Sequence, residues 1–478
     1  MNKSMLCAGL LALLSLVASQ FANAASCIWT GGSLANSNWS SAANWNNCGG
    51  AHAVPVNGDT LGFPDGVPRL TNTNDIVKLI AAKLVIAGPA NLSGLPIGLS
   101  DGIAATVPLA STSPVVNLNI VLETNAQTFQ CSGAHKALTI SGTVSLNNQA
   151  LTLDSACSIF LTGKITGTGS ITKIGTTTAF LEGATSNYTG VTTINAGKVR
   201  VVSSAGLGAS GPGNETVVND GAALELEDIA TAEDLTLSGT GISSQGALFA
   251  AAGNNTLTGA ITLAASSNIG AAAGTNLSIE GAIDGGNVSL VKVGAGTVAL
   301  QNVNTYTNTT IVSGGVLEVN GQVDFAGVNT GTTLAGAGIA TDGINIQPGA
   351  VFSPGTAAGA NIGSFNSSVM AWNGTGTLVF QLGVDSAHSD QLAVTSFNSV
   401  GTGFEFQFGD GATPPVPGVA YTLVSFTLTN FTAGDFSFTY AGTGPGSSMT
   451  GTFAMTATQL QFTPATVVSD LVFHDGFE

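Results

Sequence analysis

The chain has 478 residues, of which 64 are glycine, 44% are hydrophobic and only 8% are charged. Acidic residues outnumber basic ones by 27 to 10, a formal net charge of -17, and so few cations exclude nucleic-acid binding, which needs clustered Lys and Arg. The hydrophobic fraction excludes a disordered tract. Gly, Thr, Ser, Asn, Val and Ile largely replace the usual helix formers, which favours an all-β fold.

The N-terminus has the pattern of a signal peptide. Lys3 precedes an apolar run over residues 10–17, and small residues follow at the position where a signal peptidase cuts. We expect cleavage between Ala24 and Ala25, which removes residues 1–24 from the mature protein. No later stretch reaches the roughly 20 apolar residues that a membrane-spanning helix needs. We therefore expect an exported protein with no membrane span after the signal is removed.

A tryptophan-rich segment, residues 25–68, begins the mature chain. It contains Trp29, Trp39 and Trp45. These rings could cover the apolar end of the first coil of the fold, or they could stack on the sugars of a ligand. Covering the end of the fold is the simpler explanation, so we interpret the segment as an N-terminal cap.

Four cysteines remain after the signal is removed. An exported chain with an even number of cysteines usually oxidises them. We expect Cys27 to pair with Cys48 and Cys131 with Cys157, although the sequence alone permits three pairings. None of the four has a Cys or His partner two to four residues away, so a zinc site is not favoured.

Between residues 69 and 400 the sequence consists of short alternating runs. Leu138-Thr139-Ile140 and similar runs place aliphatic side chains on one face and hydroxyl side chains on the other. Glycine- and asparagine-rich turns separate them. Such short strands predict a solenoid in which a coil of roughly 20 residues returns to its start and each strand pairs with its equivalent in the next coil. We expect a right-handed parallel β-helix with a Thr- and Asn-rich outer wall.

The chain also repeats itself, most clearly over residues 167–201 and 285–319. Lys173 and Lys292 are 119 residues apart, and Tyr188 and Tyr306 are 118 apart. In a chain with only 4 tyrosines, this spacing indicates a duplicated structural unit.

The repeated pattern is Lys-x-Gly-x-x-Thr-x-x-Leu, followed by Tyr-Thr and then by Gly-x-Val/Leu-x-Val. It resembles the autotransporter-associated β-strand repeat, also called the passenger-associated transport repeat, of large exported bacterial β-helix proteins. The tryptophan-rich opening and the segments 331–364 and 376–394 agree with this resemblance. It implies an exported passenger-like protein built as a β-solenoid.

Full autotransporters end in a membrane barrel whose strands each need roughly 10 residues. The 78 residues after Val400 are too few for a barrel of a dozen strands. We expect residues 401–465 to form a C-terminal β cap and 466–478 a short tail. Without its own translocator, the chain would depend on separate export or sorting machinery.

Candidate residues for chemistry are few. The densest acidic stretch holds Glu225, Glu227, Asp228, Glu233 and Asp234. Glu225 and Glu227 flank Leu226, which predicts that both lie on an outward strand face. No Lys, Arg or His lies nearby in sequence, so we interpret the stretch as a solvated face rather than a catalytic pair.

Two further sets have simple structural explanations. Asp385, His388 and Asp390 suggest a metal site or a partial triad, but their segment has the composition of a serine-rich turn. Lys173 and Lys292 occupy matched repeat positions, which favours a role in stacking over ligand binding. We therefore expect no catalytic residue, bound metal or cofactor.

The sequence favours a non-enzymatic role in adhesion or surface structure, outside the cell or on its outer surface, with the periplasm as an alternative location. The expected partner is a surface ligand, either a glycan or a host or cell-surface component, and not nucleic acid. Two alternatives stay open. One is a polysaccharide lyase or hydrolase, because β-helices also form such enzymes; the other is an inert spacer without a ligand.

Overall fold

The computed structural model describes residues 26–48, 53–106, 108, 111–133, 136–356, 362–442 and 447–468. Ala24, Ala25 and the C-terminal tail after residue 468 lie outside these ranges. Helical structure in the described residues is limited to three-residue 3-10 turns, η1 (Ala42–Asn44), η2 (Ile242–Ser244), η3 (Ser386–His388) and η4 (Ala433–Asp435). Nothing helical in the described part of the chain has the length and apolarity to span a membrane.

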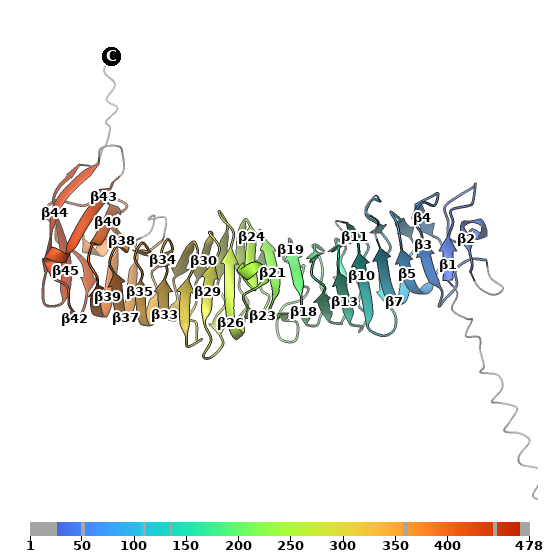
Figure 1. Cartoon of the computed structure of the whole chain (residues 1–478), viewed down its shortest axis with the longest axis horizontal. Coiled ribbons are helices and arrows are strands. Elements are labelled where there is room, and N and C mark those ends of the chain that lie inside the picture. Colours follow the sequence, from blue (N-terminus) through green and yellow to red (C-terminus); the bar gives the residue numbers. More distant parts are fainter. Residues whose placement is uncertain are drawn as a thin grey trace, which may run out of the picture. The chain divides into compact units, whose positions relative to one another are not determined.

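The chain divides into two compact units, residues 1–167 and 168–478, and each is an all-β solenoid (Figure 1). The strands of the first unit are β1 (Ser26–Trp29), β2 (Trp45–Asn46), β3 (Thr60–Phe63), β4 (Thr71–Asn74), β5 (Ile80–Ile86), β6 (Asn91–Gly94), β7 (Ile97–Thr106), β8 (Val115–Val116), β9 (Ile120–Leu122), β10 (Gln127–Ser132), β11 (Ala137–Ile140), β12 (Val144–Ser145), β13 (Leu151–Ser155), β14 (Ser158–Leu161) and β15 (Ile165–Thr166).

Parallel pairing from coil to coil builds the first unit. One ladder runs β1-β3-β5-β7-β10-β13, a second runs β4-β6-β8-β11-β14, and a third runs β7-β9-β12-β15. In-register stacking places like residues above one another, and one fully buried column contains Leu61, Leu84, Ile103, Phe129 and Leu153. Burying each such side chain contributes about 1.5–3 kcal/mol, so the column is the continuous core that the alternating pattern predicts.

The strands of the second unit are β16 (Ile171–Ile174), β17 (Thr178–Leu181), β18 (Thr192–Ile194), β19 (Gly197–Val201), β20 (Thr216–Val218), β21 (Ala222–Glu227), β22 (Ala230–Thr231), β23 (Leu235–Gly239), β24 (Leu248–Ala252), β25 (Asn254–Leu257), β26 (Ile261–Ala271), β27 (Asn276–Ile279), β28 (Ile283–Asp284), β29 (Leu290–Val293), β30 (Thr297–Leu300), β31 (Thr309–Val312), β32 (Val316–Val319), β33 (Gln322–Val328), β34 (Thr333–Gly336), β35 (Ile339–Ile346), β36 (Val351–Pro354), β37 (Ser364–Asn373), β38 (Thr377–Leu382), β39 (Gln391–Val400), β40 (Phe404–Asp410), β41 (Tyr421–Ser425), β42 (Leu428–Thr429), β43 (Phe436–Ala441), β44 (Ser448–Met455) and β45 (Gln459–Val468).

The second unit uses the same parallel stacking. Its longest ladder runs β16-β18-β20-β23-β26-β29-β31-β33-β35-β37-β39-β41. Coil length varies more than the roughly 20 residues expected: it is 16 residues between the paired Thr310 and Ala326 and 32 between Ala393 and Ser425. The extra residues form turns outside the ladders, which leaves the stacked core continuous.

The two disulfides expected from the sequence are present in the first unit, where Cys27 pairs with Cys48 and Cys131 with Cys157. Cys131 lies on β10 and stacks over Ser155 of β13 in the parallel ladder. The second disulfide therefore links neighbouring coils.

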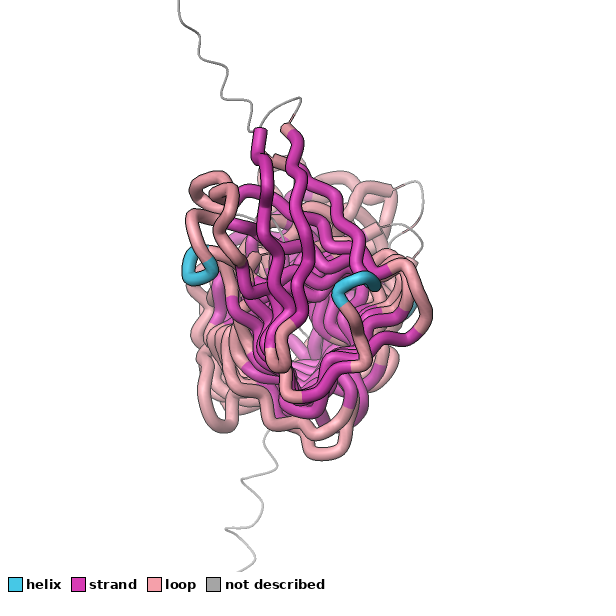
Figure 2. The backbone as a smooth tube through the Cα atoms, turned by 90° about the vertical axis from the view of Figure 1, so that its left-hand side faces the viewer, coloured by secondary structure: helices cyan, strands magenta, loops and turns pink. Residues whose placement is uncertain are grey.

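Antiparallel strands and aromatic side chains lie at the beginning of the first unit and at the end of the second. In the first unit β2 pairs antiparallel with β1, and Trp29, Trp39, Trp45 and Phe63 form a cluster in which the Trp29 and Trp45 ring centroids are 5.1 Å apart. In the second unit β45 pairs antiparallel with β41 and β44 (Figure 2). The N-terminal cluster fits the expected cap.

Candidate functional site

The first repeated lysine is an interior residue. Lys173 on β16 is 0% exposed. Its ammonium group donates hydrogen bonds to the carbonyls of Ile174 (2.8 Å) and Gly175 (2.7 Å) and to that of Ala196 in the next coil (3.0 Å). Gly197 has φ of +68°, and a Cβ there would lie 2.8 Å from the Lys173 Nζ atom, so the glycine leaves room for this contact. The lysine thus joins two successive turns.

The second repeated lysine makes the equivalent contacts. Lys292 on β29 is 1% exposed and donates to the carbonyls of Val293 (3.1 Å), Gly294 (2.8 Å) and Gly314 (2.6 Å). Burial lowers the pKa of Lys292 to about 8. Both lysines therefore bind backbone within the fold.

The repeated tyrosines are buried too. The Tyr188 hydroxyl is 2.7 Å from the Thr192 hydroxyl, and the Tyr306 hydroxyl is 2.6 Å from the Thr310 hydroxyl. Burial raises the pKa of both phenols above their ordinary value. The residues that define the repeat thus satisfy one another inside each coil and are not available to a ligand at the surface.

A buried carboxyl group lies in the coils that follow the first repeat. Thr192 stacks on Thr216, whose hydroxyl donates a 2.6 Å hydrogen bond to Glu233 Oε1. Glu233 is 1% exposed, and burial raises its pKa to about 8; the charges of Asp234 and Glu215 act in the same direction, and the Thr216 hydrogen bond acts against them. Around neutral pH this group is largely protonated.

The interpretation of the acidic stretch as a solvated face is wrong for Glu225. This residue lies on an outward position of β21 but is only 3% exposed. Its carboxylate is 2.6 Å from Lys198 Nζ and 3.0 Å from an Arg200 guanidinium nitrogen, and Arg200 also reaches Glu227 at 3.3 Å. Lys198 and Arg200 lie on β19, the adjacent strand in the ladder, so the expected lack of basic neighbours held only along the sequence. The cluster is an ion-pair network across two coils.

The structure does not bring Asp385, His388 and Asp390 together. Asp385 is exposed and caps η3, and its carboxylate lies 2.7 Å from His388 Nδ1; this hydrogen bond is the main reason that the pKa of Asp385 is lowered. Asp390 is 0% exposed and accepts hydrogen bonds from the backbone N–H groups of Gln381 (2.7 Å) and Gly363 (2.8 Å). Burial raises the pKa of Asp390 to about 7.

No group of three or more His, Cys, Asp or Glu side chains suited to a metal occurs among the described residues. The tryptophan cluster is closed as well. Trp29, Trp39 and Trp45 are 1%, 0% and 7% exposed, and their indole N–H groups donate to Arg69, Asn72 and Trp39 respectively. Buried rings of this kind cannot stack on the sugars of a surface ligand.

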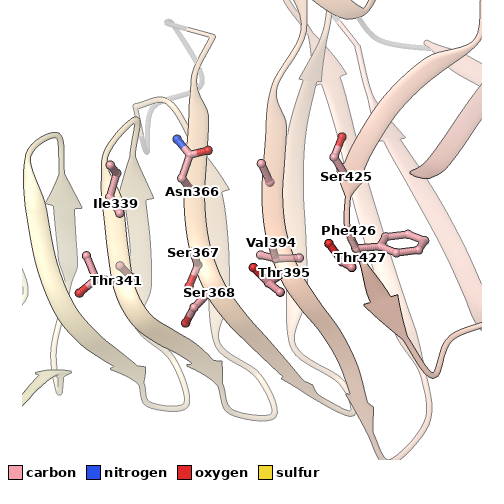
Figure 3. Close-up of a pocket in the computed structure, with 12 residues that line it drawn as sticks. Ile339, Thr341, Asn366, Ser367, Ser368, Val394, Thr395, Ser425, Phe426 and Thr427 are labelled. Carbon is pink, nitrogen blue, oxygen red and sulfur yellow. The ribbon is translucent and has the colours of Figure 1, made fainter. Parts of the chain in front are cut away.

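The outer wall of the second unit has an open groove of about 530 Å³ across β35, β37, β39 and β41. Each coil contributes three successive residues, the middle one buried and the outer two facing the groove. Figure 3 shows two resulting rows across the strands, one containing Ile339, Asn366 and Ser425 and the other containing Thr341, Ser368, Thr395 and Thr427. None of the lining residues is charged. Sequence reasoning did not find this groove.

Two segments of the chain match a known family. Residues 171–201 and 290–319 match the passenger-associated-transport-repeat. Both are passenger-associated transport repeats. The resemblance inferred from the Lys and Tyr spacing is thereby confirmed, and the buried lysines and tyrosines described above lie within the matched segments.

One relative extends the comparison beyond the repeats. Over 235 residues, or 48% of this chain, the sequence is 34% identical to a protein described as "Adhesin BmaC autotransporter" from Brucella suis biovar 1 (strain 1330). The match covers only 6% of that relative's length. The two passenger-associated transport repeats are thus part of a longer region of similarity to an autotransporter adhesin.

Proposed function

We propose that this protein is an exported, non-enzymatic adhesin that acts at or beyond the cell surface. The observation that carries the proposal is the pair of passenger-associated transport repeats in a β-solenoid, together with the 34% identity to an autotransporter adhesin over 235 residues. A solenoid holds successive coils in a fixed register, so a weak contact on one coil recurs nearby. Several weak contacts engaged together give avidity far above that of one contact.

The chemistry of the acidic residues supports a binding role over a polysaccharide lyase or hydrolase. Glu225 and Glu227 are bound by Lys198 and Arg200, and Asp390 is held by two backbone N–H groups. A glycosidase needs two carboxyl groups that are free to reach opposite sides of a glycosidic bond. These three carboxyl groups instead stabilise the coils.

Adhesion can be tested with beads coated with the mature protein and applied to a panel of cultured cells and cell-surface extracts. The matched control is the same beads coated with the heat-unfolded protein. We expect the folded protein to retain more beads on at least one surface after washing. Equal retention by folded and unfolded protein on every surface would refute an adhesive role.

A further inference from the structure

The outer groove across β35, β37, β39 and β41 differs from the rest of the molecule's candidate sites in having free hydrogen-bonding groups. Within the described residues, the side chains of Asn366, Thr395, Ser425 and Thr427 have no hydrogen-bond partner in the protein. A Ser or Thr hydroxyl offers one donor and two acceptor lone pairs, and an Asn side chain offers both a carbonyl and an amide group. The groove therefore presents both donors and acceptors to whatever lies in it.

The groove owes its form to a bend repeated in each coil. Residues along a strand normally alternate inward and outward, but on β37 the successive residues Ser368 and Val369 are both partly exposed, and on β39 the same holds for Thr395 and Ser396. The pairing of β35 with β37 shifts register between Ala340 and Ile344, at the same position. The bend turns the hydroxyl row of each coil toward the same side.

Charge restricts the occupant. The groove's lining is neutral, and at one end Thr341 donates a 3.0 Å hydrogen bond to Asp324. A carboxylate at that end repels an anionic chain, and the absence of an acidic row along the lining gives a cationic chain no partner. An uncharged ligand meets neither obstacle.

The repeat of the lining gives the occupant its form. Neighbouring strands are about 4.8 Å apart, so the four strands present equivalent groups over about 14 Å. A sugar ring in an extended polysaccharide is close in length to one strand spacing, and its hydroxyls both donate and accept hydrogen bonds. Ile339, which is 40% exposed, and Ala393 supply apolar contacts for the carbon–hydrogen faces of the rings.

We propose that this groove binds an uncharged, unbranched polysaccharide lying across the coils. The proposal rests on the adhesive function proposed above and names the class of ligand that one site would take. Each sugar would bind weakly through the hydroxyls of a single coil, and the chain would gain affinity by engaging successive coils.

The test is native affinity electrophoresis of the mature protein, whose negative charge carries it through the gel. The gels contain soluble β-1,4-, β-1,3- or α-1,6-linked glucan or galactomannan, and polygalacturonate serves as the anionic comparison. We expect at least one neutral polysaccharide to retard the protein and polygalacturonate to leave it unretarded. Retardation by none of the neutral polysaccharides, or by polygalacturonate alone, would overturn the proposal.

Two variants locate the site. Thr395→Tyr places a ring in the groove and should weaken binding at least ten-fold, whereas Thr452→Tyr, at an exposed position of β44 outside the groove, should bind as the wild type does. Thr427→Val keeps the shape of the side chain and removes one hydroxyl, and it should weaken binding about five-fold; it also serves if Thr395→Tyr does not fold. Unchanged binding in a folded Thr395→Tyr or in Thr427→Val would place the ligand elsewhere and refute the assignment.

The bead assay separates this inference from the adhesive function. Beads that adhere while no neutral polysaccharide retards the protein would remove the groove proposal and leave adhesion standing. Binding of a neutral polysaccharide in the groove by a protein whose beads adhere to nothing would support the site and remove the adhesive function.

Discussion

Replacing Glu233 with Gln should remove a large pH dependence from the stability of the second unit. Glu233 is 1% exposed and accepts a hydrogen bond from Thr216. Glutamine has nearly the same shape and keeps a carbonyl oxygen for this bond, but it cannot ionise. The substitution therefore changes the titration of the site and little else.

The sign follows from the pKa of Glu233 in the two states. It is raised from 4.5 to about 8 in the folded chain. Between these values the folded chain holds the proton more tightly, so the contribution to stability is complete below pH 4.5 and is lost as the pH rises through 8. Each tenfold change in proton affinity corresponds to about 1.4 kcal/mol, so ionising this group lowers the free energy of unfolding by about 5 kcal/mol across the range.

The assay is urea unfolding of the wild type and of Glu233→Gln at pH 5 and pH 9. We expect similar free energies of unfolding at pH 5, and at pH 9 a variant about 5 kcal/mol more stable than the wild type. Asp390, with a pKa raised to about 7, titrates in both proteins and cancels in the difference. Glu280→Gln, at an exposed position, is the control and should follow the wild type. A difference between wild type and Glu233→Gln that does not change with pH would refute the reasoning.

Three further predictions concern the fold and the absence of catalysis. Lys292→Met leaves three backbone carbonyls without their donor and should lower the free energy of unfolding by about 3 kcal/mol or more, with faster hydrogen exchange at Gly314; slow exchange there in the variant would contradict the buried-lysine role. Replacing Cys131 and Cys157 together with Ser should cost about 3 kcal/mol, and an unchanged urea midpoint would contradict the disulfide's contribution. Incubation with neutral and acidic glycans, with and without calcium, should leave their chain lengths unchanged, and shortening that Glu225→Gln abolishes would favour the enzyme alternative.

The parts of the fold that the sequence predicts are those that recur locally. Alternating aliphatic and hydroxyl residues specify short strands, and the spacing of Lys173 and Lys292 identifies the repeat because rare residues recur at a fixed distance. Contacts between coils depend instead on coil length, which varies with the turns. For that reason the pairing of Glu225 with Lys198 and Arg200, 27 and 25 residues away, could not be read from the neighbouring sequence.

The groove was missed for the same physical reason. Thr341, Ser368, Thr395 and Thr427 belong to different coils, and no fixed sequence interval connects them. Their alignment depends on a bend and a register shift that appear only when the strands are paired. A scan for two successive outward residues within otherwise alternating strands is the signal that would have pointed to it.

The buried lysines also bear on how long the protein survives among proteases. Trypsin-like enzymes cleave after Lys or Arg and must bind the surrounding backbone in an open, extended form, and the whole sequence offers 10 such residues. Lys173 and Lys292 have their side chains inside the coil, and Lys198 and Arg200 lie within a strand paired on both sides. At these four positions a protease finds no accessible cleavage site unless a coil first opens, so the stacking that the lysines support also protects the chain from digestion.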